Sequence, residues 1–171
     1  AVRLKASKGM LSQFPSLSKI FSILNVSQLF KFQLPDMVSG GMPYTEINGN
    51  FYFRDGFVST TDLFVKSDAM NIALVGKIDL IKEESDATIG IQPLQTVDKV
   101  VSRIPIVGWI ITGKEGTFVT TYFEIKGKLT DPIVTAIPFQ FMATGVFDIF
   151  KRVFQLPVKI FTDTGEVLIG K

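Results

Sequence analysis

The stretch that decides the fold reads Met70-Asn-Ile-Ala-Leu-Val-Gly-Lys-Ile-Asp-Leu80. Apolar residues or glycine stand at every even position, whereas Asn71, Lys77 and Asp79 are among the residues between them. A period of two is typical of a β-strand, because successive side chains of a strand point to opposite sides of the sheet. The stretch therefore predicts a strand with one apolar face and one more polar face.

The same alternation precedes this strand. Residues 47–54 alternate, reach the turn signal Asp55-Gly56, and give way to a second alternating stretch at 58–65. An Asp-Gly pair between two alternating stretches is a strong hairpin signal. Residues 47–65 therefore predict two antiparallel strands, and the Gly- and Pro-rich segment 37–44 before them predicts a loop.

The alternation also continues after the strand. The polar run 82–86 is typical of a hairpin tip, residues 87–92 alternate again, and a further strand is predicted at 117–128 with Asp131-Pro132 as its end. Such short connections join neighbouring strands of an antiparallel meander. The predicted sheet has one dry side and one wet side.

Two amphipathic helices are predicted outside these strands. Within residues 16–32 the apolar residues Leu17, Ile20, Phe21 and Leu24 have helical spacing, and a second apolar stripe lies within residues 142–155. Each stripe has two explanations, of which packing on the sheet is preferred. The alternative is that the first helix covers an open apolar groove or lipid, and that the second lies at a membrane interface.

The predicted fold is therefore α+β and mainly β. We expect a curved antiparallel sheet with one apolar, groove-like face, flanked by N- and C-terminal amphipathic helices, with a short helix at 94–103. The 171 residues suit a single domain, 1–171, that buries about 70% of its unfolded surface.

The composition is rich in apolar residues. Hydrophobic residues make up 46% of the chain, charged residues 20%, and there are 16 Phe. No uninterrupted apolar stretch reaches the roughly 20 residues of a membrane-spanning helix. The Phe content has two explanations: some rings face a groove, membrane or partner, or all of them fill a sealed core.

Several classes of function are excluded by what the chain lacks. It has no Cys and no His, which removes disulfides, thiolate and imidazole catalysis, and the usual zinc or iron ligands. Its net charge of +2 comes without a basic stripe, so nucleic-acid binding is not expected. We expect no bound metal and no cofactor.

Two short motifs only look like catalytic sites. The stretch Gly108-Trp-Ile-Ile-Thr-Gly-Lys114 is similar to a phosphate-binding loop, but Glu115 stands where a magnesium-binding hydroxyl is needed. The stretch Asp163-Thr-Gly165 is similar to an aspartic-protease corner, but a single copy cannot make the shared carboxylate pair. The first indicates an apolar hairpin or membrane-facing loop and the second a turn, so neither nucleotide binding nor an enzyme is predicted.

The dry face of the predicted sheet is the candidate site for apolar ligands. Acyl chains would lie along it, since each buried methylene contributes about 0.8 kcal/mol. The expected lipid-binding residues are Phe51, Phe53, Met70, Ile72, Leu74, Ile78, Ile89, Ile91, Val119, Phe123 and Ile125. The expected membrane or partner contacts are Trp109, Ile110, Ile111, Phe147, Phe150, Phe154, Lys151 and Arg152.

A series of short passages also points to a family. In order, they are Lys19-Ile-Phe-Ser-Ile-Leu-Asn-Val26, Leu34-Pro35, Gly49-Asn-Phe51 with Asp55-Gly56, Gly76-Lys-Ile-Asp-Leu80, Pro93-Leu-Gln95, Pro105-Ile-Val-Gly-Trp109, Thr112-Gly-Lys114 and Leu156-Pro-Val-Lys159. The series resembles the C-terminal region of the bacterial AsmA-like family, relatives of the TamB and YhdP proteins. The resemblance covers roughly the whole chain.

This resemblance implies a periplasmic segment of a longer protein, held by an N-terminal inner-membrane anchor outside this chain. The partners that it implies are phospholipid, a membrane surface and other envelope proteins, and its sheet would carry phospholipid toward the outer membrane. It implies no catalytic residue. An alternative is an outer-membrane assembly scaffold whose open sheet edge pairs with a strand of another protein.

Overall fold

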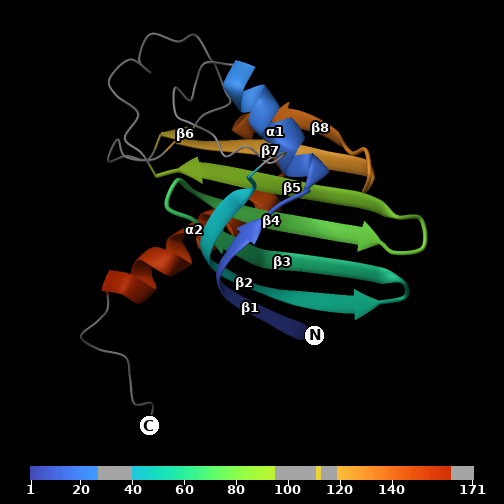
Figure 1. Ribbon diagram of the computed structural model, residues 1–171, viewed down its shortest axis with the longest axis horizontal. Helices are drawn as coiled ribbons and strands as arrows, with labels where there is room; N and C mark the ends of the chain where they lie inside the picture. The colour runs from blue at the N-terminus through green and yellow to red at the C-terminus, as the bar shows by residue number, and fades with distance from the viewer. Residues whose placement is uncertain (27–39, 95–110, 113–118, 163–171) are drawn as a thin grey trace.

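The computed structural model describes residues 1–26, 40–94, 111–112 and 119–162. In these ranges the main element is an antiparallel sheet, drawn in Figure 1. Its strands are β1 (Val2–Leu11), β2 (Met42–Arg54), β3 (Phe57–Lys66), β4 (Met70–Asp79), β5 (Glu84–Pro93), β6 (Ile111–Thr112), β7 (Val119–Lys128) and β8 (Ile133–Ile137).

The order of the strands is β1-β2-β3-β4-β5-β7-β6, and β8 also pairs with β7. Every pairing is antiparallel. The predicted meander is therefore confirmed, and so is the fold class, α+β and mainly β.

The strand predicted at 70–80 is β4, and it pairs with its neighbours in the register that the alternation requires. Ile72 lies opposite Ile91 and Leu74 opposite Ile89. The hairpin predicted at Asp55-Gly56 is also confirmed, with φ angles of 49° and 81° at these two residues. Positive φ at both central residues is the geometry of the tight turn that suits the twist of paired strands.

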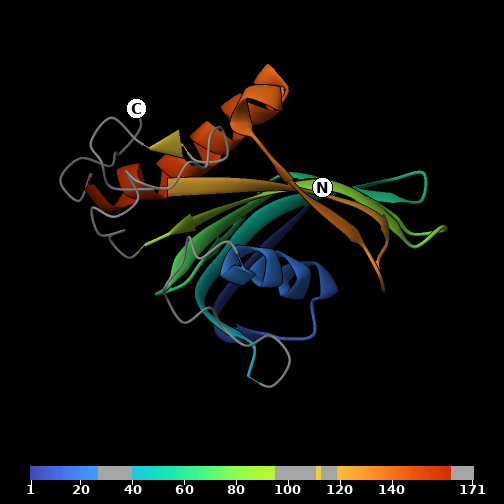
Figure 2. The ribbon, with the colours of Figure 1, turned by 90° about the horizontal axis from the view of Figure 1, so that it is seen from above.

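Two helices lie on opposite faces of the sheet. Figure 2 shows the sheet curling around α1 (Pro15–Val26), whereas α2 (Thr144–Thr162) lies on the outer side. We call the side that holds α1 the concave face and the other side the convex face. The preferred interpretation of both apolar stripes, packing on the sheet, is confirmed.

The predicted helix bounds differ from the observed ones. The first helix begins at Pro15, as its position predicts, and the predicted part 27–32 lies outside the described residues. The second helix continues past residue 155 to Thr162, so the predicted end was wrong. Pro157 lacks a backbone donor but does not end α2.

Two strands were missed, and one loop was placed wrongly. β1 pairs with β2 in one register throughout, but its period of two is broken at Lys8, a polar residue with a φ of 53° at a position where the alternation of Val2, Leu4 and Ala6 calls for an apolar one. The strand β8 was missed because it is only 5 residues long and follows a proline. The predicted loop 37–44 ends too late, since β2 begins at Met42.

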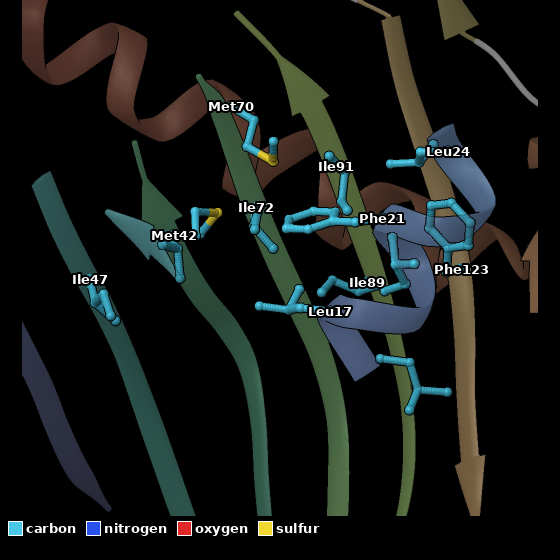
Figure 3. Close-up of a cluster of buried hydrophobic side chains, with 13 residues drawn as sticks. Leu17, Phe21, Leu24, Met42, Ile47, Met70, Ile72, Ile89, Ile91 and Phe123 are labelled. Atoms are coloured by element: carbon cyan, nitrogen blue, oxygen red, sulfur yellow. The ribbon is translucent and has the colours of Figure 1, made fainter. Parts of the chain in front are cut away.

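Two cores result, one on each face of the sheet. The first lies between α1 and the concave face, and in Figure 3 Phe21 of α1 lies among Ile72 and Ile91 of the sheet. The second lies between α2 and the convex face, where the Phe150 ring meets the Tyr122 ring edge-on at 5.2 Å between centroids. Burial raises the pKa of Tyr122 to about 12, so this phenol stays neutral.

Candidate functional site

The concave face is the candidate site, and it has two parts. Helix α1 packs on the first part, which we call the covered half. Here the side chains are almost fully buried, and Phe123 is 0% exposed. The covered half consists of Ile47, Val65, Met70, Ile72, Ile89, Ile91, Phe123 and Ile125.

Helix α1 fits this half through its predicted apolar stripe. Leu17, Ile20, Phe21 and Leu24 are all buried, at the spacing that brings them to one side of a helix. Fully burying a side chain of this size contributes about 1.5–3 kcal/mol. The stripe therefore supplies most of the free energy that holds α1 in the concavity.

One polar link fixes where α1 sits. The Lys19 ammonium lies 2.5 Å from Asp131 Oδ1 and donates to the Pro132 carbonyl oxygen at 2.7 Å. The hydrogen bond that Lys19 donates to Asp131, and then the positive charge of Lys19, lower the pKa of the Asp131 carboxyl. The link joins α1 to the turn between β7 and β8, beside a groove of about 520 Å³ that Ile23 and Val134 help to line.

The second part of the concave face lies beyond α1, near the N-terminal edge of the sheet. Phe53 is 59% exposed and Val2 56%, and Leu4 is also exposed. Cross-strand pairing brings Val2 beside Phe51, and Phe53 beside Val58. We call this part the open corner; it consists of Val2, Leu4, Phe51, Phe53, Val58 and Ile78.

The open corner spans β1 to β4. Four strands at about 4.8 Å spacing make a strip about 14 Å across, which is enough for more than one acyl chain to lie on. Val58, Ile78 and Ser85 are successive cross-strand partners on β3, β4 and β5. The first two are apolar, and Ser85 is the first polar residue of the three. The open corner is therefore an apolar surface with a polar boundary.

An irregularity between β2 and β3 shapes this corner. Strand β3 has one extra residue between Thr60 and Leu63, so its register shifts against both β2 and β4. The Asp62 carboxylate spans the gap by accepting hydrogen bonds from Asn50 N at 2.7 Å and from Asn50 Nδ2 at 2.5 Å. A bulge bends and twists its strand, so this one helps to curl the sheet.

The residues predicted to bind lipid fall into both parts of the face. Phe51, Phe53 and Ile78 belong to the open corner, whereas Leu74 is half-buried beside the covered half. Val119 begins β7, but its side chain is not among the described ones. The remaining predicted residues, Met70, Ile72, Ile89, Ile91, Phe123 and Ile125, lie beneath α1.

Three residues of the open corner were not among the predicted lipid-binding residues: Val58, which lies on a predicted strand, and Val2 and Leu4. Val2 and Leu4 lie on β1, which was not predicted as a strand. The alternation Val2, Leu4, Ala6 is present before Lys8, and it is the signal that could have found them.

The residues predicted to contact a membrane or partner lie elsewhere. Phe150 and Phe154 pack on the convex face, and the Phe154 ring meets the Phe64 ring at 6.3 Å between centroids. Lys151 and Arg152 are exposed on α2, and Phe147 is half-buried. Trp109, Ile110 and the side chain of Ile111 lie outside the described residues, as do the motifs 108–110, 113–115 and 163–165.

Neither a metal-binding cluster nor a membrane-spanning helix is found among the described residues. Among them, no group of three or more Asp and Glu side chains is arranged to hold a metal ion. No helix within the described ranges has the length and apolar character needed to span a membrane. What the described structure does offer is a curled antiparallel sheet with an apolar, partly open concave face.

These features describe a curled antiparallel β-sheet whose apolar concave face is covered in part by α1. A protein-family model described as YhdP protein matches residues 1–134. The chain therefore belongs to the YhdP family, which is among the AsmA-like bridge-like lipid transport proteins of the bacterial envelope. This confirms the resemblance. No curated protein and no solved structure shows significant similarity to the chain.

Proposed function

We propose that the open corner binds acyl chains of phospholipid, and that this chain is one segment of an apolar path through the periplasm between the inner and outer membranes. The observation that carries the proposal is the group of exposed apolar side chains on the concave face, with Phe53 59% exposed. Membership of a lipid transport family supports it. The proposal includes no catalytic step and no cofactor.

Burial of apolar surface provides the affinity. Six methylenes covered by the open corner would contribute about 5 kcal/mol, at about 0.8 kcal/mol each, before the cost of ordering the chain. This contribution needs no polar contact, so it does not select a headgroup. The headgroup stays in water beyond the polar boundary of the corner.

Helix α1 occupies the other half of the same apolar surface. Its buried stripe fills the space in which an acyl chain would otherwise contact Ile72, Ile89 and Ile91. Lipid passing along the whole concave face would therefore have to replace α1. In the arrangement described, the proposed binding surface is the open corner.

The test uses two neighbouring positions that point to opposite faces. Phe53 lies on the concave face and Tyr52 on the convex face, and their exposed fractions are similar, 59% and 50%. A photoreactive amino acid replaces each in turn in the whole chain, which is then purified without detergent and irradiated. We expect lipid adducts at position 53 at least about fivefold above those at position 52.

Native mass spectrometry of the same preparation measures bound lipid. Absence of bound phospholipid, together with equal adduct yields at the two positions, would sink the proposal.

One observation favours a second candidate function. Within the described residues, β1 pairs only with β2, so its other edge presents backbone groups that a strand of another protein could pair with. A scaffold of this kind would capture a protein strand without bound lipid. Protein crosslinks along β1 in a lipid-free preparation would favour it over lipid binding.

A further inference from the structure

The turns at one end of the sheet form a single apolar edge. The β2–β3 turn and the β4–β5 turn are joined, since Leu80 N donates to the Gly56 carbonyl oxygen at 2.9 Å. The Ile81 side chain lies over Gly56, where an added Cβ would be 2.9 Å from Ile81 Cδ1. We call this edge the hairpin rim; it consists of Tyr52, Phe53, Phe57, Leu80 and Ile81, all of them exposed.

The fold does not require these apolar residues. The Asp79 carboxylate closes the β4–β5 turn by accepting hydrogen bonds from the backbone of Ile81 and Lys82, both at 3.0 Å. The Asp55-Gly56 pair supplies the β2–β3 turn. Ile81 is nevertheless 82% exposed at the tip. Polar side chains would serve both turns equally well, so the apolar ones call for an explanation outside the fold.

The rim is apolar on both faces of the sheet. Phe53 pairs with Val58 on the concave face, whereas Tyr52 pairs with Ser59 on the convex face. Phe57 is also on the convex face, where Lys77 Nζ lies 5.9 Å from the centre of its ring. A protein partner covering one face would meet only half of these side chains. A lipid layer that receives the rim edge-on meets all of them.

The cations around the rim do not outnumber the acids. The cations are Arg54, Lys77, Lys82 and Lys128, and the acids are Asp55, Asp79, Glu83, Glu84 and Asp86, the cross-strand partner of Lys77. Without an excess of cations, the rim has no particular attraction for anionic lipid. Its association with a bilayer would depend on apolar insertion and would change little with salt.

We propose that the hairpin rim inserts edge-on into the interfacial layer of a lipid bilayer. Phe53 belongs to both the rim and the open corner, so apolar surface is continuous from the bilayer to the concave face. Tyr is enriched at this layer of a membrane, and Phe and Leu side chains bury apolar surface there. Only the role of this insertion rests on the proposed function: it would let acyl chains enter the open corner without crossing water.

The test places a dye at the rim. Because the chain has no Cys, Ile81→Cys creates a unique site for an environment-sensitive dye. A matched control is Phe141→Cys, since Phe141 is 75% exposed but lies between β8 and α2, away from the turns of the rim. With vesicles of phosphatidylcholine, we expect a blue shift and quenching by brominated lipid at position 81 and neither at position 141.

Binding strength is measured with unlabelled protein by vesicle flotation. The Leu80→Ser/Ile81→Ser variant should partition about tenfold more weakly than the wild type, and Ile81→Ser alone should be intermediate. Phe141→Ser should bind like the wild type. Raising the salt from about 0.1 to about 0.5 M should change wild-type binding less than about twofold.

Three results would overturn the inference: no binding of the wild type to these vesicles, unchanged binding of the double variant, or binding that needs anionic lipid and is lost in salt. The last would indicate a basic surface such as Lys151 and Arg152 on α2. Lipid adducts at position 53, measured without vesicles, test the proposed function independently of the rim. If they persist while rim insertion fails, only this inference falls; if they are absent while the rim inserts, only the proposed function falls.

Discussion

The covered half and the open corner belong to one face of one sheet, yet they differ in what lies on them. Both are built from alternating apolar residues on neighbouring strands, such as Ile72 on β4 in the covered half and Phe53 on β2 in the open corner. In the covered half, α1 excludes water from the side chains. In the open corner, Val2, Leu4 and Phe53 are exposed, and the other three side chains are half-buried. The alternation makes the face apolar, but the position of α1 decides which part of it is buried as core and which part stays accessible to a ligand.

The largest expected effect is a difference in the free energy of unfolding between substitutions in the covered half and in the open corner. Phe123→Ala should lower the free energy of unfolding by about 3–5 kcal/mol, because it leaves a cavity beneath α1. Phe53→Ala, with the same loss of atoms, should cost less than about 1 kcal/mol. Urea unfolding of both variants measures the difference. Similar costs would mean that the open corner is also packed as core.

The second prediction concerns a substitution that should expose the covered half. Ile20→Ser removes the centre of the α1 stripe and should cost about 2–5 kcal/mol. Photoreactive groups at positions 72 and 89 should then form lipid adducts that the parent chain does not form. Ser22→Ala, on the exposed side of α1, is the control and should leave adduct yields unchanged. Adducts of equal yield with and without Ile20 would show that α1 does not control access.

The third prediction concerns the open corner alone. Phe53→Ser should weaken acyl-chain binding about tenfold, and the free energy of unfolding should change by less than about 1 kcal/mol. Fluorescent fatty-acid titration and urea unfolding of the same sample check both parts. A loss of binding that accompanied a large loss of stability would point to misfolding.

The smallest expected effect tests the link that positions α1. The pKa of Asp131 is lowered in the folded state, chiefly by its hydrogen bond to Lys19 and then by the charge of Lys19. The unfolded state therefore takes up a proton first as pH falls. The stabilisation is present above the unfolded pKa of about 3.9, and it is lost as pH falls through the lower folded pKa.

Asp131→Asn should accordingly be slightly less stable than the wild type at pH 7, and the difference should vanish in strong acid. Thermal melts across this pH range measure it. Asp55→Asn, at a turn that does not touch α1, is the matched control. A difference between wild type and Asp131→Asn that persisted in strong acid would contradict the assignment.

Much of the fold could be predicted from local pattern. The strand at 70–80, the Asp55-Gly56 hairpin and the meander followed from alternation and turn chemistry, because each depends on neighbouring residues alone. Strand β1 could not be found in this way, since Lys8, a polar residue with a φ of 53°, breaks its period. The candidate site was predicted as one continuous face. Its division could not be predicted, because the position of α1 depends on residues far away in the chain.

Which side chains share a face follows from the order of the residues alone, because a strand alternates by geometry. The tertiary structure decided which of those side chains remain exposed. That decision depends on where α1 docks, and its polar link joins Lys19 to Asp131, 112 residues further along the chain. Local pattern has no information about a contact at that separation. The apolar character of the face is thus a property of each strand, whereas the exposure of its side chains depends on how the sheet and α1 pack together.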